Sequence, residues 1–236
     1  MKIEVVATAG QATENLTKGK TVVVIDVLRA TSVITTALYH GAEAVWPVAS
    51  IEEAHRLYDS FTRGTALRGG ERQGLIIPGF ELGNSPLSYT SETIAAKNII
   101  LTTSNGTHAI RNSAAAQALF VVSFLNLPFA ARQLQNATEL IIVCSGTNGR
   151  FSADDGLCAG MLILELEKFT DTICCDLGLV LRQFAAQAGS PAEKLVSCFH
   201  LNYLQSIGYQ ADIDFCLQQG LMPVLPVLTE VGSLRV

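Results

Sequence analysis

The sequence predicts an α/β fold with a mostly parallel or mixed central sheet, helices on both faces and a helical C-terminal third. Short apolar runs of strand length alternate with helix-like stretches of roughly a dozen residues over the first two thirds of the chain, which is the pattern of βαβ units. From about 151 to 220 the pattern is almost wholly helical.

The strands follow from the apolar runs, taken in chain order. The runs at 21–26, 98–103 and 139–144 have continuously apolar centres at 22–25, 99–101 and 141–144, as expected for parallel strands buried on both faces. The last run contains Pro223 and Pro226, which predict a short or edge strand because proline cannot donate a ladder hydrogen bond. The predicted strands are 2–7, 21–26, 43–48, 65–69, 98–103, 118–123, 139–144 and 223–228.

The helices follow from local start signals and from apolar content. A capping box begins a helix at 50–61. A serine before a proline predicts another helix that begins at 85–87, and an asparagine before a leucine–proline pair predicts one at 126–136. The apolar stretch 157–166 is interrupted by a glycine and a glutamate, so it predicts a buried helix rather than a membrane span.

Length and composition indicate one globular α/β domain over 1–236. The chain is 49% apolar and only 16% charged, and it is long enough to bury a large core. The turns at 104–107 and 146–149 resemble each other weakly. If the chain held two related subdomains, their boundary would lie near 115–125, but a similarity of four positions does not establish a duplication.

Charge and targeting signals exclude several classes of function. The net charge of −5 argues against nucleic-acid binding, which usually requires a basic face. No apolar run approaches the roughly 18 residues of a membrane span, and residues 1–6 are strand-like rather than a signal peptide. We therefore expect a cytoplasmic protein that binds neither nucleic acid nor membrane.

The cysteines and histidines show no metal-binding pattern. The six cysteines contain no C-x-x-C pair, which suits reduced, buried thiols rather than a zinc site or a disulfide framework. The four histidines lack the short spacings of a metal site, and we assign none of them a role.

Three buried strands end in polar turns that are followed by helices, at 22–32, 99–107 and 141–150. Such turns direct free backbone N–H groups and a helix dipole to one edge of a sheet, which is a geometry that binds anions. Three of them together predict an enzyme that acts on a small anionic metabolite. The candidate substrate-binding residues are Arg29, Asn105, Gly106, Thr107, Gly146, Thr147 and Arg150.

Carboxylates near these turns predict a magnesium site. Asp26 ends a buried strand three residues before Arg29, which places a hard-oxygen ligand beside a cation that can bind phosphate in a fork. Glu71 lies in the glycine-rich stretch 68–86, where a long irregular loop predicts a lid or a binding loop. The candidate catalytic residues are Asp26, Glu71 and Arg29, and the candidate Mg²⁺ ligands are Asp26, Glu71, Asp154 and Asp155.

Each carboxylate also has a simpler explanation. Asp26 suits a helix N-cap, and Glu71 suits a solvated loop tip. Asp154 and Asp155 fall in the first turn of a predicted helix, where the helix dipole alone favours acids.

Residues 144–150 are also compatible with a second phosphatase mechanism, that of the cysteine-dependent phosphatases. Cys144 and Arg150 have the C-x₅-R spacing of cysteine-dependent phosphatases, in which a helix N-terminus and the arginine stabilise a thiolate. The chain has no Asp-Pro pair to supply the acid of the low-molecular-weight tyrosine phosphatases. A buried thiol at the end of a strand is therefore the simpler interpretation of Cys144, and the loop remains a candidate phosphate-binding turn.

Taken together, these motifs resemble the 2-phosphosulfolactate phosphatase family. The similarity covers about the first two thirds of the chain in the family's order, and Gly-Phe-Glu-Leu-Gly-Asn-Ser-Pro is its most specific part. The matching segments are Val24–Ser32, Gly70–Arg72, Gly79–Pro86, Thr103–Thr107, Gly146–Thr147 and Phe151–Asp155.

The resemblance implies Mg²⁺-dependent hydrolysis of (2R)-2-phospho-3-sulfolactate, or of a related phosphorylated 2-hydroxy acid, to the free hydroxy acid and phosphate. In the family this is a step toward coenzyme M. The expected partner is a small anionic phosphorylated substrate, and a homodimer is compatible with the sequence. The alternatives are a metal-independent cysteine phosphatase and a non-enzymatic sensor of a phosphorylated metabolite.

Overall fold

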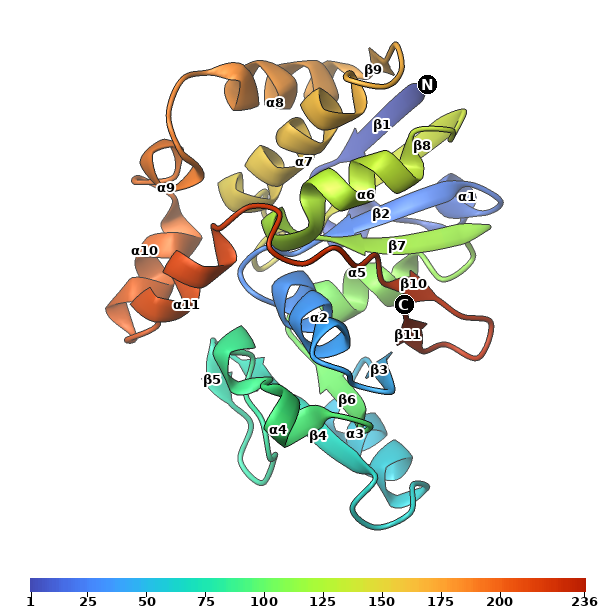
Figure 1. The fold of residues 1–236 in the computed structure, drawn as a ribbon, viewed down its shortest axis with the longest axis vertical. Helices are drawn as coiled ribbons and strands as arrows, with labels where there is room; N and C mark the ends of the chain where they lie inside the picture. Colours follow the sequence, from blue (N-terminus) through green and yellow to red (C-terminus); the bar gives the residue numbers. More distant parts are fainter.

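The computed structural model describes residues 1–236 and joins all the strands in one open, mixed sheet (Figure 1). The eleven strands have the order β5-β4-β6-β3-β11-β10-β7-β2-β8-β1-β9. Their bounds are β1 (Lys2–Val6), β2 (Thr21–Ile25), β3 (Ala44–Pro47), β4 (Ala66–Arg72), β5 (Leu75–Ile76), β6 (Asn98–Thr102), β7 (Ala118–Val122), β8 (Glu139–Cys144), β9 (Ile173–Cys174), β10 (Val227–Leu228) and β11 (Leu234–Arg235). The predicted α/β class is confirmed.

The central strands are parallel and buried on both faces, as their apolar runs predict. β2 pairs in parallel with β7 on one side and with β8 on the other, and β8 pairs in parallel with β1. Because side chains alternate along a strand, Val23 and Ile25 enter one apolar core while Val22 and Val24 enter the other. A run without polar residues therefore supplies two cores at once.

A second parallel group, β4-β6-β3, lies on the other side of a short C-terminal hairpin. In this hairpin β10 pairs antiparallel with β7 and β11 pairs antiparallel with β3. The strand predicted at 223–228 is only two residues long, as its prolines indicate, but it lies inside the sheet rather than at an edge.

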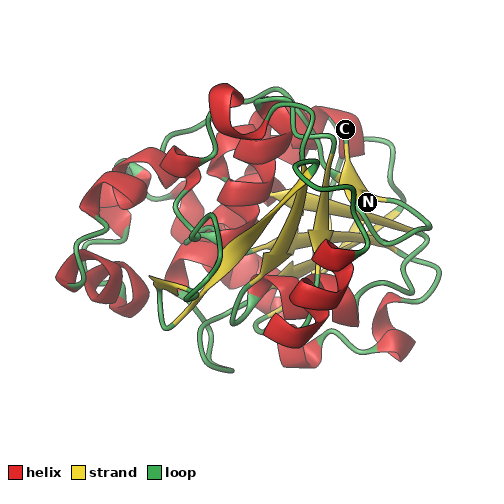
Figure 2. Cartoon of the chain, turned by 90° about the horizontal axis from the view of Figure 1, so that it is seen from below, coloured by secondary structure: helices red, strands yellow, loops and turns green.

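Helices cover both faces of the strands (Figure 2). Helices α6, α7 and α8 contribute to one core, and α2 and α5 contribute to the other. Their bounds are η1 (Ala9–Gln11), α1 (Glu14–Thr17), α2 (Ala30–Tyr39), α3 (Ile51–Asp59), η2 (Pro86–Ser88), α4 (Ser91–Ile94), α5 (Gly106–Asn112), η3 (Phe124–Asn126), α6 (Leu127–Leu134), α7 (Ala153–Leu166), α8 (Asp176–Ala186), α9 (Pro191–Lys194), α10 (Phe199–Ser206) and α11 (Gln210–Cys216). None of these helices combines the length and apolar character that crossing a bilayer requires.

The predicted helices at 50–61, 126–136 and 157–166 are confirmed as α3, α6 and part of α7. The capping box of α3 is present, since the Glu53 backbone N–H donates to Ser50 Oγ over 3.1 Å. The helix predicted at 85–87 is wrong, because only the single 3₁₀ turn η2 forms there.

Two further expectations are corrected. The stretch 68–86 is not a structureless loop, because β4 extends to Arg72 and turns back to pair with β5. The helical third also contains the strand β9, which pairs with β1 at the edge of the sheet. After α8, helices α9 to α11 return past the carboxyl ends of the central strands (Figure 1).

Candidate active site

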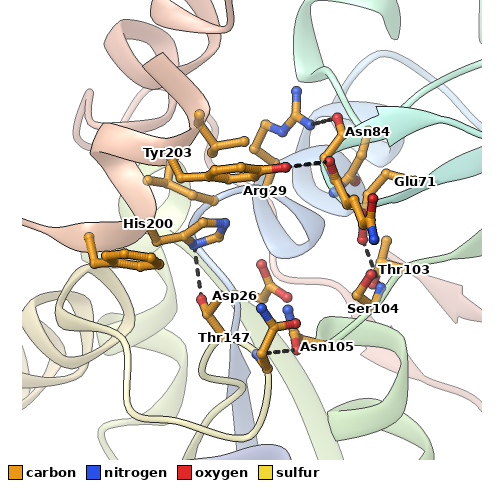
Figure 3. A pocket seen from close by; sticks show the side chains of 16 residues that line it. Asp26, Arg29, Glu71, Asn84, Thr103, Ser104, Asn105, Thr147, His200 and Tyr203 are labelled. Carbon is orange, nitrogen blue, oxygen red and sulfur yellow. Dashed lines mark hydrogen bonds between the residues drawn. The ribbon is translucent and has the colours of Figure 1, made fainter. Parts of the chain in front are cut away.

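A cavity of about 340 Å³ lies at the carboxyl ends of β2, β6 and β8, where the loops that follow these strands meet (Figure 3). The β4–β5 turn, the loop before η2 and helix α10 supply its other walls. This is the edge at which open α/β sheets bind ligands. The lining residues are Asp26, Leu28, Arg29, Glu71, Gln73, Gly74, Asn84, Thr103, Ser104, Asn105, Thr147, Asn148, Phe199, His200, Tyr203 and Leu204.

Asp26 follows the last residue of β2 and faces this cavity. Its Oδ1 accepts a hydrogen bond of 3.2 Å from the Ala30 backbone N–H at the start of α2. Burial raises the pKa of Asp26 to about 6, against an opposing effect of His200. A Cβ atom on Gly106 would lie only 2.6 Å from Asp26 Oδ2, so the glycine is required for this close approach.

Glu71 joins two walls of the cavity. Its Oε1 accepts from the Ser104 backbone N–H at 2.7 Å, and its Oε2 accepts from the Gly74 backbone N–H at 2.8 Å. Both bonds hold the carboxylate at the end of β4, next to the loop after β6. Each oxygen keeps a further lone pair with which it can bind a ligand.

Arg29 is 2% exposed and lines the cavity from the loop after β2. Its Nη1 donates to Asp212 Oδ2 at 2.5 Å, and its Nη2 donates to the Gly74 carbonyl at 2.7 Å. The guanidinium also lies 3.9 Å from the centre of the Tyr209 ring. Helix α11 therefore fixes the orientation of Arg29, and Asp212 offsets its charge.

Asn105 and Thr147 lie in the cavity wall, as the sequence predicts. Asn105 Oδ1 accepts a hydrogen bond of 3.1 Å from the Asn148 backbone N–H, which joins the turns after β6 and β8. Thr147 Oγ1 lies 3.1 Å from Nδ1 of His200.

His200, to which the sequence assigned no role, projects from α10 into the cavity (Figure 3). Its Nδ1 lies 3.7 Å from Asp154 Oδ2, a distance that gives an ion pair rather than a direct hydrogen bond. Burial works to lower the pKa of His200, but the charges of Asp154 and Asp26 outweigh it and raise the pKa above its usual value.

Asp154 does not line the cavity and is instead buried behind His200. Its Oδ1 accepts a hydrogen bond from Ser152 Oγ, whereas its Oδ2 has no hydrogen-bond partner and takes part in the ion pair with His200. Although burial opposes it, the interaction with His200 holds the pKa of Asp154 below its usual value. The structure thus places Asp154, a predicted metal ligand, outside the cavity as a charge partner of His200.

Asp155, the other predicted metal ligand on α7, does not reach the cavity either. It is buried outside the cavity lining, and burial raises its pKa well above the usual value. Its Oδ1 accepts from the Val27 backbone N–H and its Oδ2 from the Gly146 backbone N–H, both at 2.9 Å. Asp155 thus joins the turns after β2 and β8.

The same contact occupies the backbone N–H of Gly146, a predicted substrate-binding residue, because this N–H already donates to Asp155. Thr107 is fully buried, and its Oγ1 donates back to the Thr103 carbonyl at 3.1 Å. Neither Thr107 nor Gly106 lines the cavity. Gly106 contributes by making room for Asp26, and Thr107 by fixing the turn.

Arg150, which the sequence predicts to bind substrate, lies away from the cavity. It is exposed and absent from the cavity lining. Its backbone closes a tight turn with Thr147, with two hydrogen bonds of 2.8 and 3.0 Å. The turn carries Thr147 into the cavity and leaves Arg150 outside it.

Cys144 is unsuited to nucleophilic catalysis. It is 0% exposed within the core, outside the cavity lining. Burial, with Asp155 and Asp154 nearby, raises the pKa of its thiol well above the usual value. The thiol stays protonated and out of reach of substrate, so the geometry does not support the cysteine-phosphatase alternative.

Several lining residues were missed by the sequence reasoning. Asn84 belongs to the unusual segment Gly79–Pro86, which was a signal for a functional loop. His200, Tyr203 and their neighbours on α10 carry no such signal, because the C-terminal third has an ordinary helical pattern. Tyr203 closes the cavity over the β4–β5 turn, with its hydroxyl donating to the Gln73 carbonyl at 3.0 Å.

The remaining carboxylates, Asp26 and Glu71, suit a hard cation. Both line the same cavity and present oxygen atoms, and no group of three or more His, Cys, Asp or Glu side chains converges on one metal position. Mg²⁺ is commonly held by one or two carboxylates, with water and substrate phosphate completing its shell. The donor set therefore fits Mg²⁺ better than zinc.

Comparison with known proteins finds similarity to one family over almost the whole chain. The model of a family described as 2-phosphosulpholactate phosphatase matches residues 6–231. A protein of Clostridium perfringens (strain SM101) named "probable 2-phosphosulfolactate phosphatase" is 40% identical over 228 residues, covering 95% of this chain and 92% of the relative.

Two further relatives carry the same name. That of Caldanaerobacter subterraneus subsp. tengcongensis is 42% identical over 213 residues, covering 89% of this chain and 88% of the relative. That of Symbiobacterium thermophilum is 42% identical over 216 residues, covering 90% and 92% respectively.

Proposed function

Because this chain belongs to the 2-phosphosulfolactate phosphatase family, we propose that it is a phosphoric monoester hydrolase. Its proposed reaction is the hydrolysis of (2R)-2-phospho-3-sulfolactate, or of a related phosphorylated 2-hydroxy acid, to the free hydroxy acid and phosphate. The observation that carries the proposal is the convergence of Asp26, Glu71, Arg29 and His200 on one cavity at the carboxyl edge of the sheet.

The charge balance of this cavity supports a metal-dependent reaction. Asp26 and Glu71 face it, while the one arginine, Arg29, is already paired with Asp212. A substrate with phosphate, carboxylate and sulfonate groups would be repelled by the two carboxylates in the absence of a cation between them. We assign Mg²⁺ binding to Asp26 and Glu71; the ion would neutralise this charge and polarise the phosphoryl group.

The protein's own groups position the phosphate and handle the proton. Asn105 and Thr147 present polar side chains at the same end of the cavity as Asp26 (Figure 3). Thr147 and Asp154 hold the Nδ1 side of His200, and the Nε2 atom makes no hydrogen bond within the protein. Nε2 is therefore free to meet a ligand.

His200 is proposed as the general acid. Hydrolysis breaks the bond between phosphorus and the ester oxygen, and this oxygen leaves with a developing negative charge that needs a proton. Protonated His200, favoured by Asp154, donates it from Nε2. Of the two protons of the attacking water, one stays on the phosphate product and the other returns through solvent to His200.

Phosphate release from purified protein tests the function. The substrates are 2-phospho-3-sulfolactate, 2-phospholactate and phosphoglycolate, each measured with Mg²⁺ and with EDTA. We expect release from the first two with Mg²⁺. Ligand-dependent thermal stabilisation without any phosphate release would instead establish the sensor alternative, and full activity in EDTA would contradict the role given to Asp26 and Glu71.

A further inference from the structure

One buried polar side chain of the cavity, that of Asn84, has no hydrogen-bond partner in the protein. Asn84 is 6% exposed and lines the cavity. Its Oδ1 is completely occluded and accepts no hydrogen bond, and its Nδ2 donates to no protein group. Of the two polar atoms, Nδ2 is therefore the one that the cavity can reach.

The backbone around Asn84 is held firmly. The preceding carbonyl, of Gly83, accepts from Tyr89 Oη at 2.7 Å and from the Gly70 backbone N–H at 3.3 Å. On the other side, Ser85 Oγ donates to Asp212 Oδ1 at 2.7 Å. Asp212 Oδ2 also accepts a hydrogen bond from Arg29 Nη1. One carboxylate therefore fixes both Arg29 and the loop that carries Asn84.

An unpartnered amide at such a fixed position needs an explanation. A buried acceptor without a donor destabilises the fold, and an apolar side chain of similar size would avoid that cost. Buried polar side chains that break this rule are concentrated at functional sites, and although Oδ1 of Asn84 is out of reach, its Nδ2 is open to a ligand in the cavity. Asn84 therefore has the features of a binding residue and lacks those of a structural one.

The position of Asn84 indicates which part of a ligand it meets. In Figure 3, Arg29 and Asn84 lie at one end of the cavity, while Asp26, Asn105 and Thr147 lie at the opposite end. Phosphate at the second end would place the acid group of a phosphorylated 2-hydroxy acid, whether carboxylate or sulfonate, at the first.

We propose that Asn84 is a specificity-determining residue: its Nδ2 donates to the substrate's non-phosphate acid group, beside the Arg29 guanidinium. This rests on the function proposed above. Because Asp212 offsets the charge of Arg29, an added neutral donor strengthens anion binding without a second arginine. The Asn84 donor also makes binding selective for substrates that carry an acid group at this position over substrates that carry a neutral substituent there.

The test combines unliganded stability with binding of two probes, for wild type, Asn84→Ala and Asn84→Asp. The probes are 3-sulfolactate, which has both acid groups and no phosphate, and inorganic phosphate. The control is Asn15→Ala, since Asn15 is exposed on α1, outside the cavity lining. Binding is measured by calorimetry with Mg²⁺ present, and stability by the Tm without ligand.

For Asn84→Ala we expect a Tm equal to or above that of wild type and 3-sulfolactate affinity about 10- to 100-fold weaker, the usual effect of losing a hydrogen bond to a charged group. Phosphate affinity should stay within twofold. Asn84→Asp should bind 3-sulfolactate more weakly still, because like charges repel. KM for 2-phospho-3-sulfolactate should rise in parallel, with kcat changed less than threefold.

A lower Tm with unchanged 3-sulfolactate affinity would make Asn84 structural and overturn the inference. Equal weakening of both probes would place Asn84 at the phosphate end and overturn it too, as would absence of 3-sulfolactate binding by the wild type. If wild type binds 3-sulfolactate and releases no phosphate from any substrate, the proposed function fails while the role of Asn84 is still decided by the binding data.

Discussion

Asp154 at the start of α7 and His200 at the start of α10 form a buried ion pair, with Nδ1 3.7 Å from Oδ2. The pair connects the central sheet with the C-terminal helices. It also sets the charge of the imidazole that faces the cavity, since Asp154 raises the pKa of His200 while Arg29 acts in the opposite direction.

This pair makes stability depend on pH. The pKa of His200 is raised, so its contribution is fully present below the unfolded value of about 6.5 and is lost as pH rises through the folded pKa. The pKa of Asp154 is lowered, so its contribution is present above the unfolded value of about 3.9 and is lost as pH falls through the folded pKa. Both contributions coexist between about pH 4 and 6.5.

The free energy of unfolding of His200→Gln should therefore fall furthest below that of wild type between about pH 4 and 6.5. The expected difference is about 3–5 kcal/mol, the cost of breaking a buried ion pair by removing one partner. The gap should narrow above pH 7. Urea unfolding of both proteins from pH 4 to 9 measures it. A gap that does not vary with pH would show that the two side chains are not a charged pair.

Asp26→Asn should abolish turnover while the protein stays folded, because the variant loses one of the two carboxylates proposed to hold Mg²⁺. The asparagine Oδ1 can still accept from the Ala30 backbone N–H, so the start of α2 is preserved and only the charge facing the cavity is lost. Circular dichroism and Tm serve as the folding controls. Near wild-type turnover in a folded variant would exclude Asp26 from the site.

Activity should disappear in EDTA and return with Mg²⁺ more readily than with Zn²⁺, because the two carboxylates of the cavity offer only oxygen ligands. Mg²⁺ should also raise the Tm of wild type, since a ligand that binds only the folded state stabilises it. Asp26→Asn and Glu71→Gln should lose most of this shift. An equal Tm shift in both variants would place the ion elsewhere.

The two arginines should respond differently to conversion to lysine. Arg150 is exposed outside the cavity, so Arg150→Lys should stay within about 0.5 kcal/mol in stability and about twofold in kcat/KM. Arg29→Lys should lose about 10- to 150-fold in kcat/KM, because lysine cannot keep the fork that contacts Asp212 and the Gly74 carbonyl. A strong defect in Arg150→Lys would return that residue to the site.

Cys144→Ser should remain active. The fully buried thiol is not a nucleophile, so kcat should stay within about twofold of wild type, whereas the Tm should fall because an unpartnered hydroxyl enters the core at a cost of about 1–3 kcal/mol. Complete loss of turnover at an unchanged Tm would revive the C-x₅-R mechanism.

The sequence by itself determined the longer strands, the two-faced burial of the central sheet and the edge at which the cavity lies, but not the two-residue strands β5, β9 and β11. These features depend on local information. A continuous apolar run predicts a buried strand, and the residue that follows the run must lie where the carboxyl ends of the parallel strands meet. Asp26, Arg29, Asn105 and Thr147 were found in this way, each within a few residues of a strand end.

Only the tertiary structure decided which side chains of those turns enter the cavity. Thr147 and Arg150 share one turn, yet its two backbone hydrogen bonds leave one in the cavity wall and the other exposed. The sequence placed Asp155 correctly at the start of α7, but both of its carboxylate oxygens accept backbone hydrogen bonds, from Val27 and Gly146, and so join two turns of the fold. The direction of a side chain within a turn depends on backbone dihedral angles that residue type does not fix.

The tertiary structure also decided what closes the site. His200 and Tyr203 lie on a helix whose sequence pattern shows only an apolar face, and Asp212 pairs with Arg29, which lies 183 residues earlier in the chain. Periodicity reports which face of a helix is buried and carries no record of the distant segment it packs against. The wall that holds the proposed proton donor was therefore set by packing of the C-terminal helices against the strand ends.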